Sequence, residues 1–230
     1  MALYFTANNG VHGRELFRLR PDGAAVQAQD LNPGSGASPP NDLTAYNGEL
    51  YFNATDPAGN RNLYKVRGDG SVAPVASFSA GSANSFSFGL TPFNGELYFT
   101  ASDLLRGYEL RKVKADGTLA VVADINAGAP DSFPTGFTPY NGELYFAATD
   151  ASRGTELWKV RANGIVALVK DINPGVNGSS PSGYTAFNGE LYFTADDGTT
   201  APNSGKSKPT ARRFWCRTST AASQPRFPTR

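Results

Sequence analysis

Aspartate and asparagine residues recur along this chain at positions suited to binding a cation or a sugar. One set, Asp56, Asp103 and Asp150, is spaced by 47 residues. Carboxylate and amide oxygens are ligands for Ca²⁺, and they also accept hydrogen bonds from glycan hydroxyl groups. A second set occurs where the last strand of each repeat should end; it comprises Asp30, Asn32, Asp124, Asn126, Asp171 and Asn173. We treat both sets as candidate binding residues, with Ca²⁺ as the only cofactor they suggest.

These side chains also have a purely structural interpretation. Asp and Asn cap turns by bonding their own backbone, and an acidic residue at the same place in every repeat is typical of that role. The repeated tyrosines could stack on sugars, although adjacent Tyr-Phe pairs in a strand indicate core packing; they are Tyr51, Tyr98, Tyr145 and Tyr192. Both interpretations stay open at this point.

Other site chemistry is nearly absent from the sequence. Cys216 and His12 are the only residues of their types, which excludes an intrachain disulfide and a multi-cysteine zinc site. We find no nucleophile elbow, phosphate loop or metal-ligand pair. Enzymes on repeat folds gather unlike groups at one place, whereas these copies are nearly alike. The sequence predicts no catalytic residue.

An internal repeat positions the candidate residues. The string Asn-Gly-Glu-Leu-Tyr-Phe occurs four times, each copy 47 residues after the last, at Asn47–Phe52, Asn94–Phe99, Asn141–Phe146 and Asn188–Phe193. Asn-Gly readily takes the positive φ angles of a two-residue hairpin turn. One unit reads as four strands, at 136–140, 143–147, 156–160 and 165–172.

Four strands in 47 residues, with turn signals between them, are typical of a β-propeller blade. The sequence therefore predicts an all-β protein with about four such blades, in a closed or a partial ring. The repeat domain is expected at 1–197, with copies starting near residues 3, 50, 97, 144 and 191.

Two motifs in the third repeat resemble a known family. Glu156–Val160 reads Glu-Leu-Trp-Lys-Val, and Lys170–Gly175 reads Lys-Asp-Ile-Asn-Pro-Gly after an intervening turn. Together they are similar to the bacterial ELWxxDGT-repeat proteins, and the resemblance covers Leu3 to about Asp197. The chain departs from the family motif at three places. Trp158 is replaced in the other copies, Asn163 occupies a position that is Asp in the motif, and Ser77-Phe78-Ser79 replaces Asp-Ile-Asn. The resemblance implies a propeller fold, and a secreted or cell-surface parent protein, but no activity.

The last part of the chain, 198–230, departs from the repeat and is expected to be a disordered, basic tail. Asn203 to Thr220 can be back-translated and read from one nucleotide earlier as Glu-Leu-Trp-Lys-Val-Lys-Ala-Asp-Gly-Thr-Ala-Val-Leu-Val-Gln-Asp-Ile-Asn. That string is the missing part of the next repeat, and Asn203 lies 47 residues after Glu156. We hypothesise a frameshift between about Asp197 and Ala201, which resequencing of the gene would test.

The start of the chain decides how a ring could close. Met1 falls inside a hairpin of the repeat, so the first strand set lacks its inner strand. Pro181–Phe187 could supply that strand and close a four-bladed ring. In the alternative, a partial ring exposes an edge that favours oligomerisation.

The net charge of the repeat domain indicates which classes of partner it is suited to bind. The tail holds seven Lys or Arg and no Asp or Glu, which leaves 14 basic and 20 acidic residues in 1–197, a net charge of −6. An acidic domain disfavours nucleic acid. No apolar run is long enough to insert into a membrane, and the chain starts without a signal peptide.

The sequence favours a non-catalytic scaffold that binds glycans, cations or a protein through its long loops. Two alternatives remain. One is a truncated fragment of a larger surface propeller without a function of its own, and the other is a carboxylate-based glycan hydrolase or lyase.

Overall fold

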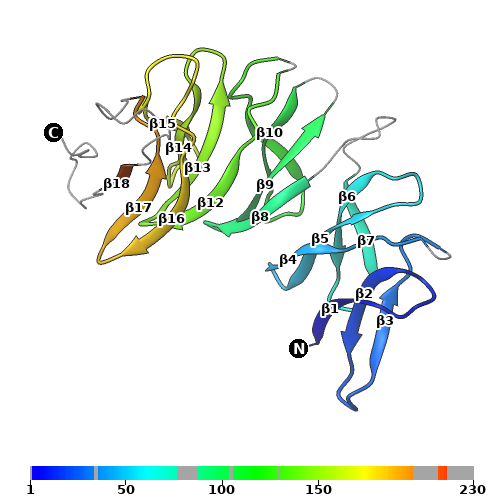
Figure 1. Ribbon diagram of the computed structural model, residues 1–230. Coiled ribbons are helices and arrows are strands. Elements are labelled where there is room, and N and C mark those ends of the chain that lie inside the picture. The colour runs from blue at the N-terminus through cyan, green and yellow to red at the C-terminus, as the bar shows by residue number, and fades with distance from the viewer. Residues whose placement is uncertain are drawn as a thin grey trace, which may run out of the picture. The chain divides into compact units, whose positions relative to one another are not determined.

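Figure 1 shows the computed structural model of the chain. It describes residues 2–33, 36–76, 87–103, 106–128 and 130–198, except the side chains of 76 and 103, together with the backbone of 212–216. The strands form five antiparallel sheets, and within each sheet the strand order follows the chain order. The predicted all-β class is confirmed. The described residues form no helix that is long and apolar enough to cross a membrane.

The five sheets follow one another along the chain. The first contains β1 (Leu3–Asn8), β2 (Arg14–Leu19) and β3 (Ala25–Gln29). The second contains β4 (Asn41–Tyr46), β5 (Glu49–Thr55), β6 (Arg61–Val66) and β7 (Val72–Ala76). The third contains β8 (Ser87–Phe93), β9 (Glu96–Asp103), β10 (Gly107–Val113) and β11 (Leu119–Ala123).

The fourth sheet contains β12 (Thr135–Tyr140), β13 (Glu143–Asp150), β14 (Gly154–Val160) and β15 (Val166–Lys170). The fifth contains β16 (Ser182–Phe187), β17 (Glu190–Ala195) and β18 (Arg212–Cys216). The chain divides into two compact units. The first comprises Met1–Gly107 and Arg111–Ala120, and the second comprises Tyr108–Leu110 and Val121–Arg230. We describe each unit by itself.

The Asn-Gly pairs form the predicted hairpin turns. Asn141 has a φ of 48° and Gly142 a φ of 73°, and the other three pairs have nearly the same values. Two successive positive φ angles define the type I′ turn, whose twist matches that of the flanking strands. The turn places Tyr140 opposite Glu143 and fixes the register of β12 on β13.

The core lies between successive sheets of each unit. In the first unit, Tyr46 and Tyr51 of the second sheet cluster with Leu90, Leu97 and Val113 of the third. In the second unit, Tyr145 and Leu157 of the fourth sheet cluster with Leu191 and Phe193 of the fifth. The adjacent residues Tyr51 and Phe52 are both buried because Tyr51 packs against the third sheet and Phe52 packs against the first. The core interpretation of the repeated tyrosines is therefore confirmed at Tyr51, Tyr98 and Tyr145.

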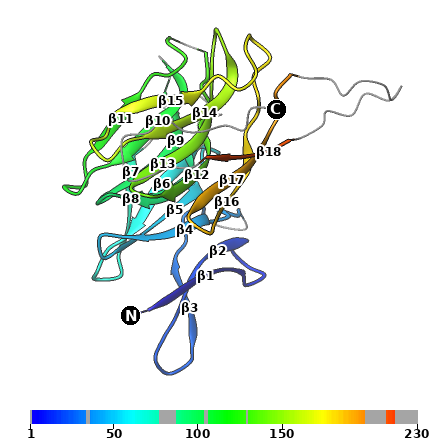
Figure 2. The ribbon, with the colours of Figure 1, turned by 90° about the vertical axis from the view of Figure 1, so that its left-hand side faces the viewer.

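Two expectations about the chain ends differ from the structure. The segment 181–187 was expected to be able to join the first strand set, but β16 pairs with β17, and the first sheet has three strands. In the tail, β18 pairs antiparallel with β17 (Figure 2), which departs from the predicted disorder. The outer edge of β17 offers unpaired backbone groups, and a strand there satisfies them. Residues 199–211 and 217–230 lie outside the described residues.

Candidate functional site

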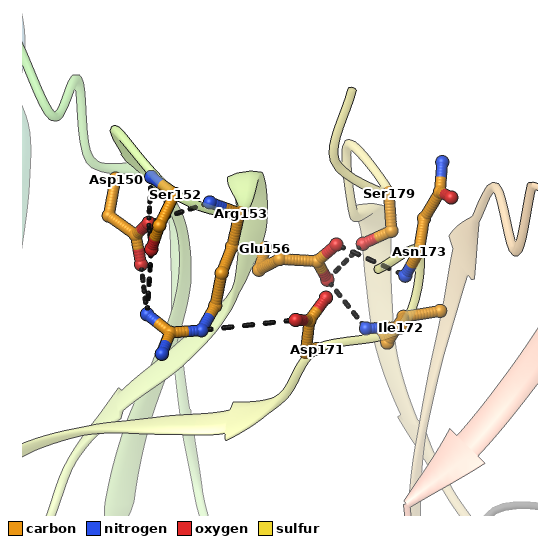
Figure 3. Close-up of polar contacts among 8 residues, drawn as sticks. All are labelled: Asp150, Ser152, Arg153, Glu156, Asp171, Ile172, Asn173 and Ser179. Atoms are coloured by element: carbon orange, nitrogen blue, oxygen red, sulfur yellow. Dashed lines mark hydrogen bonds and ion pairs between the residues drawn. The ribbon is translucent and has the colours of Figure 1, made fainter. Parts of the chain in front are cut away.

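Members of both predicted acidic sets lie at the same end of the strands in the fourth sheet. In the fourth sheet, β13 ends at Asp150, and β15 ends just before Asp171. Both strands are antiparallel to β14, so they run in the same direction and end at the same edge. Figure 3 shows Asp150, Arg153 and Asp171 at this edge. We call the corresponding end of each sheet, where the loops after these strands lie, the loop face.

Asp150 is held by its own turn. Its Oδ1 accepts hydrogen bonds from the backbone N–H groups of Ser152 and Arg153 and from the Ser152 hydroxyl, each 2.8 Å long. Its Oδ2 accepts a 2.8 Å bond from Arg153 Nη1. Burial alone would raise the pKa of Asp150, but these hydrogen bonds outweigh it and hold the pKa below its usual range. The carboxylate is largely used by the turn that it caps.

Replacing Asp150 by Asn is expected to remove a pH-dependent part of the stability. A lowered folded-state pKa stabilises the protein above the unfolded value of 3.8 and loses that effect as the pH falls through the folded value. The cost of Asp150→Asn should therefore be about 1–2 kcal/mol near neutral pH and shrink below about pH 4. Urea unfolding across that pH range measures it. A cost independent of pH would contradict the assignment. Asn at this position is compatible with the turn, since Asn9 caps the same turn of the first repeat.

The other members of this set behave alike where they are described. Asp56 Oδ1 accepts from the backbone N–H groups of Ala58 and Asn60, and its Oδ2 accepts from the side chains of Asn60 and Asn62. Burial would raise the pKa of Asp56, yet these bonds lower it. The side chain of Asp103 lies outside the described residues.

The second set contains asparagines that cap loops and aspartates that accept fewer hydrogen bonds from the described residues. The side-chain amide of each asparagine donates to a backbone carbonyl five residues later, in the pairs Asn32–Ala37, Asn126–Asp131 and Asn173–Gly178. Asp124 Oδ2 accepts from the Gly128 N–H at 3.4 Å. Asp171 Oδ2 lies 3.8 Å from Arg153 Nε. The Oδ1 atoms of Asp30 and Asp171 are buried and have no hydrogen-bond partner among the described residues.

Three buried glutamates were not predicted as site residues from the sequence, although each lies in a repeated motif. Glu15, Glu109 and Glu156 occupy the same position in three repeats, and each is fully buried. Glu156 accepts hydrogen bonds from the Ile172 and Asn173 N–H groups and a 2.6 Å bond from the Ser179 hydroxyl (Figure 3). Equivalent bonds join Glu15 to Leu31 and Ser38, and Glu109 to Ile125 and Ser132. We call each set a glutamate clamp, since it fastens the loop after the outer strand to the middle of the sheet.

Burial dominates the electrostatics of two of the clamps, those of Glu109 and Glu156. It raises the pKa of Glu109 and Glu156 above the usual value, although the hydrogen bonds from serine and backbone groups oppose it. A nearby carboxylate, Asp124 or Asp171, adds to the rise. A fully covered carboxylate cannot reach a substrate at the surface. In the described part of the chain, no three His, Cys, Asp or Glu side chains gather into a group that could hold a metal ion.

An exposed aromatic ring, Phe133, beside the half-buried ring of Tyr108 is a second feature that was not predicted from the sequence. Phe133 is 47% exposed, and its ring centroid lies 5.0 Å from that of Tyr108. Asp131 is exposed beside them, and its Oδ1 accepts a 2.8 Å bond from the Tyr108 N–H. The pair lies on the loop face, next to the clamp of Glu109. Phe133 has a φ of 47°, as does Ser180 at the equivalent position 47 residues later. This exchange of Ser for Phe is the sequence signal for the site.

The comparisons with known proteins concern the fold. No family model matches this chain, and no curated protein matches its sequence. A solved prolyl endopeptidase is similar, with a TM-score of 0.58 and 12% identity, over 98% of this chain and 33% of its own. A puromycin hydrolase is similar with a TM-score of 0.50 and 17% identity, over 93% of this chain and 36% of its own.

The BP39L lectin from Burkholderia pseudomallei is also similar, with a TM-score of 0.50 and 12% identity, over 99% of this chain and 65% of its own. The chain thus spans about a third of the length of the two hydrolytic enzymes. At these identities the likeness shows the fold alone. The repeated antiparallel sheets are blades of a β-propeller fold, which confirms the predicted fold class.

Proposed function

We propose that this chain is a non-catalytic propeller module that binds carbohydrate at the Tyr108–Phe133 pair. The observation that carries the proposal is an exposed ring at the loop face with an exposed carboxylate, Asp131, fixed beside it. An aromatic face packs against the apolar C–H face of a sugar, while a carboxylate accepts hydrogen bonds from its hydroxyl groups. The two together are the chemistry of a small glycan site.

The clamps support a binding role over catalysis. A general acid or base must come within hydrogen-bonding reach of the reacting group. Glu109 and Glu156 are covered and already accept bonds on both carboxylate oxygens, so they act as fasteners of the loops. A rigid loop presents its side chains with little loss of entropy on binding, which favours affinity.

The likeness to a lectin is compatible with the proposal, and the likeness to peptidases shows that the fold alone does not decide function. We also propose that the chain belongs with the ELWxxDGT-repeat proteins, since its 47-residue unit carries their motifs. That membership supports an extracellular or surface address for the parent protein.

Replacing Phe133 by Ser is expected to weaken glycan binding without unfolding the protein. Loss of the stacked ring should weaken binding by roughly tenfold or more. Ser is the natural residue at the equivalent position, where Ser180 adopts the same φ, so the loop accepts it. A glycan array, with and without Ca²⁺, identifies the sugar class, and calorimetry with that sugar compares the variants.

The reverse exchange, Ser180→Phe, is the matched control. It places an aromatic ring at the same position of the next repeat and should leave binding at Phe133 unchanged. A wild-type protein that is folded and binds no glycan on the array would refute the proposal. So would a Phe133→Ser variant with full affinity.

A further inference from the structure

The Asp131 carboxylate forms no ion pair with any residue that the structure describes. Its Oδ1 accepts the bond from the Tyr108 N–H, whereas its Oδ2 accepts no hydrogen bond from the described residues. The loop that carries it, 124–134, contains a second aspartate, Asp124, and no Lys or Arg. The site therefore presents a negative charge that its own loop does not neutralise.

The fold of the loop does not require an aspartate at this position. The loops after β3 and β15 carry Ala37 and Gly178 there. In both of these loops the glutamate clamp still forms on the next residue, Ser38 or Ser179. Since the loop is held without this carboxylate, the exposed charge of Asp131 favours a role in binding.

The rings beside Asp131 are suited to a cation as well as to a sugar. The centroids of Tyr108 and Phe133 lie 5.0 Å apart, and their planes are tilted by 51°. The negative face of an aromatic ring attracts a cation that lies within about 6 Å of the ring centroid. Because Phe133 is 47% exposed, a ligand can approach its ring from solvent.

The same combination of groups already holds an ammonium group elsewhere in this chain. Lys159 Nζ lies 2.9 Å from Glu143 Oε1 and 5.9 Å from the centroid of the Tyr145 ring. Two further lysines lie between a carboxylate and a tyrosine ring in the same way; they are Lys65, with Glu49 and Tyr51, and Lys112, with Glu96 and Tyr98. At Asp131 the carboxylate and the rings are present, but no lysine of the described part of the chain pairs with them.

We propose that the sugar bound at the Tyr108–Phe133 pair carries a protonated amine, as in a hexosamine whose nitrogen is not acetylated. This inference rests on the proposed glycan site and specifies the class of its ligand. The ammonium group takes the place that the lysine has in the three internal sites. It donates a charge-assisted hydrogen bond to Asp131 Oδ2, while the C–H face of the same sugar covers Phe133.

Charge discriminates between classes of sugar at such a site. A charge-assisted hydrogen bond is roughly twice as strong as a bond between neutral groups, so an ammonium sugar is favoured over a neutral one. An acidic sugar would bring a second negative charge next to Asp131, which is repulsive. The net charge of −6 of residues 1–197 also attracts cations to this domain.

Calorimetry with matched pairs of sugars tests the amine. The probes are chains of three glucosamine or galactosamine units, and the same chains with every nitrogen acetylated. The full-length protein should bind the free-amine form of one pair roughly tenfold more tightly than its acetylated form. Added salt should reduce this preference, because the charges meet at an exposed site.

Replacing Asp131 by Asn removes the charge and keeps an amide oxygen that accepts from the Tyr108 N–H. The preference for the free amine should fall from about tenfold to about threefold or less, the remainder coming from the rings. The matched control is Asp116→Asn, in the turn after β10, where the carboxylate also accepts from a backbone N–H, that of Thr118. Asn163 is the natural residue at the equivalent position, so the turn accepts Asn, and the preference should not change.

The possible results separate this inference from the glycan site itself. Suppose a neutral or acetylated sugar binds as tightly as its free-amine form and loses affinity in Phe133→Ser. The ammonium is then wrong, and the glycan site stands. If the folded wild type binds no sugar, the glycan site is wrong, and this inference falls with it. A lysine peptide that competes as strongly as the glucosamine chain would also overturn the inference, since the site would then recognise an amine without its sugar.

Discussion

Replacing Glu156 by Ala is expected to destabilise the protein by about 3 kcal/mol or more. The change leaves the Ile172 and Asn173 N–H groups and the Ser179 hydroxyl without their acceptor. Each buried donor left unpaired costs about 1–3 kcal/mol, and the missing side chain adds a cavity. Urea unfolding of the full chain measures the loss.

A second glutamate of the same sheet serves as the control. Glu143 is partly exposed and accepts bonds from Tyr145 and Lys159 at the rim of the sheet. Exposed or half-exposed ion pairs contribute about 0–1 kcal/mol, so Glu143→Ala should cost about 1 kcal/mol. Equal losses for the two variants would show that Glu156 is not a clamp.

The pH dependence separates the clamp from simple packing. Burial raises the folded-state pKa of Glu156 above the unfolded value of 4.5. For a raised carboxyl pKa, the stabilisation is fully present below the unfolded value and is lost as the pH rises through the folded one. The wild type should therefore exceed Glu156→Gln in free energy of unfolding by more at about pH 4 than at about pH 7. A difference that grows with pH would contradict the assignment.

Much of the fold follows from local sequence signals. The Asn-Gly pairs specify the turns because few other residues tolerate two successive positive φ angles. Exact spacing of 47 residues then places every strand relative to its turn. The core interpretation of Tyr98 and Tyr145 needed only the pattern of adjacent aromatics, because covered sheets bury both faces.

The site was harder to predict because its contacts are not local. Glu156 meets Ser179 across 23 residues that include all of β15. The signal for this pair is the recurrence of Glu and Ser 23 residues apart in three repeats, which shows only when the copies are aligned. The aspartates were predicted from residue type, which does not show whether their oxygens are already used by turns. Phe133 could have been found from its departure from the repeat, since Ser180 occupies the same place.

The tail illustrates a different limit. The repeat predicts that the strand after β17 should place residue 207 opposite Leu191, as Val160 lies opposite Leu144. The structure places Cys216 there instead, nine residues later. A free strand edge accepts backbone from any sequence with β propensity, so pairing with β17 does not depend on the repeat motif. The frameshift hypothesis stays a prediction for the gene sequence.

The second large loss of stability is expected at Gly154, where the backbone of 176–178 lies close to the start of β14. Gly154 begins β14 with a φ of +65°, and an added Cβ would meet the Val176 carbonyl oxygen at 2.5 Å and the Gly178 nitrogen at 2.6 Å. Both atoms belong to the loop that Glu156 fastens, and backbone cannot move aside without breaking that loop. Gly154→Ala should therefore cost about 3 kcal/mol or more, from left-handed strain and from the clash.

Gly164 is the matched control for this substitution. It also has a positive φ, +82°, but an added Cβ would meet nothing within 4 Å. Gly164→Ala should cost only the strain of the left-handed conformation, about 1–2 kcal/mol. Urea unfolding of the two variants then isolates the contact between β14 and its loop, because the backbone strain is common to both. Equal costs would show that the loop yields to the added methyl group.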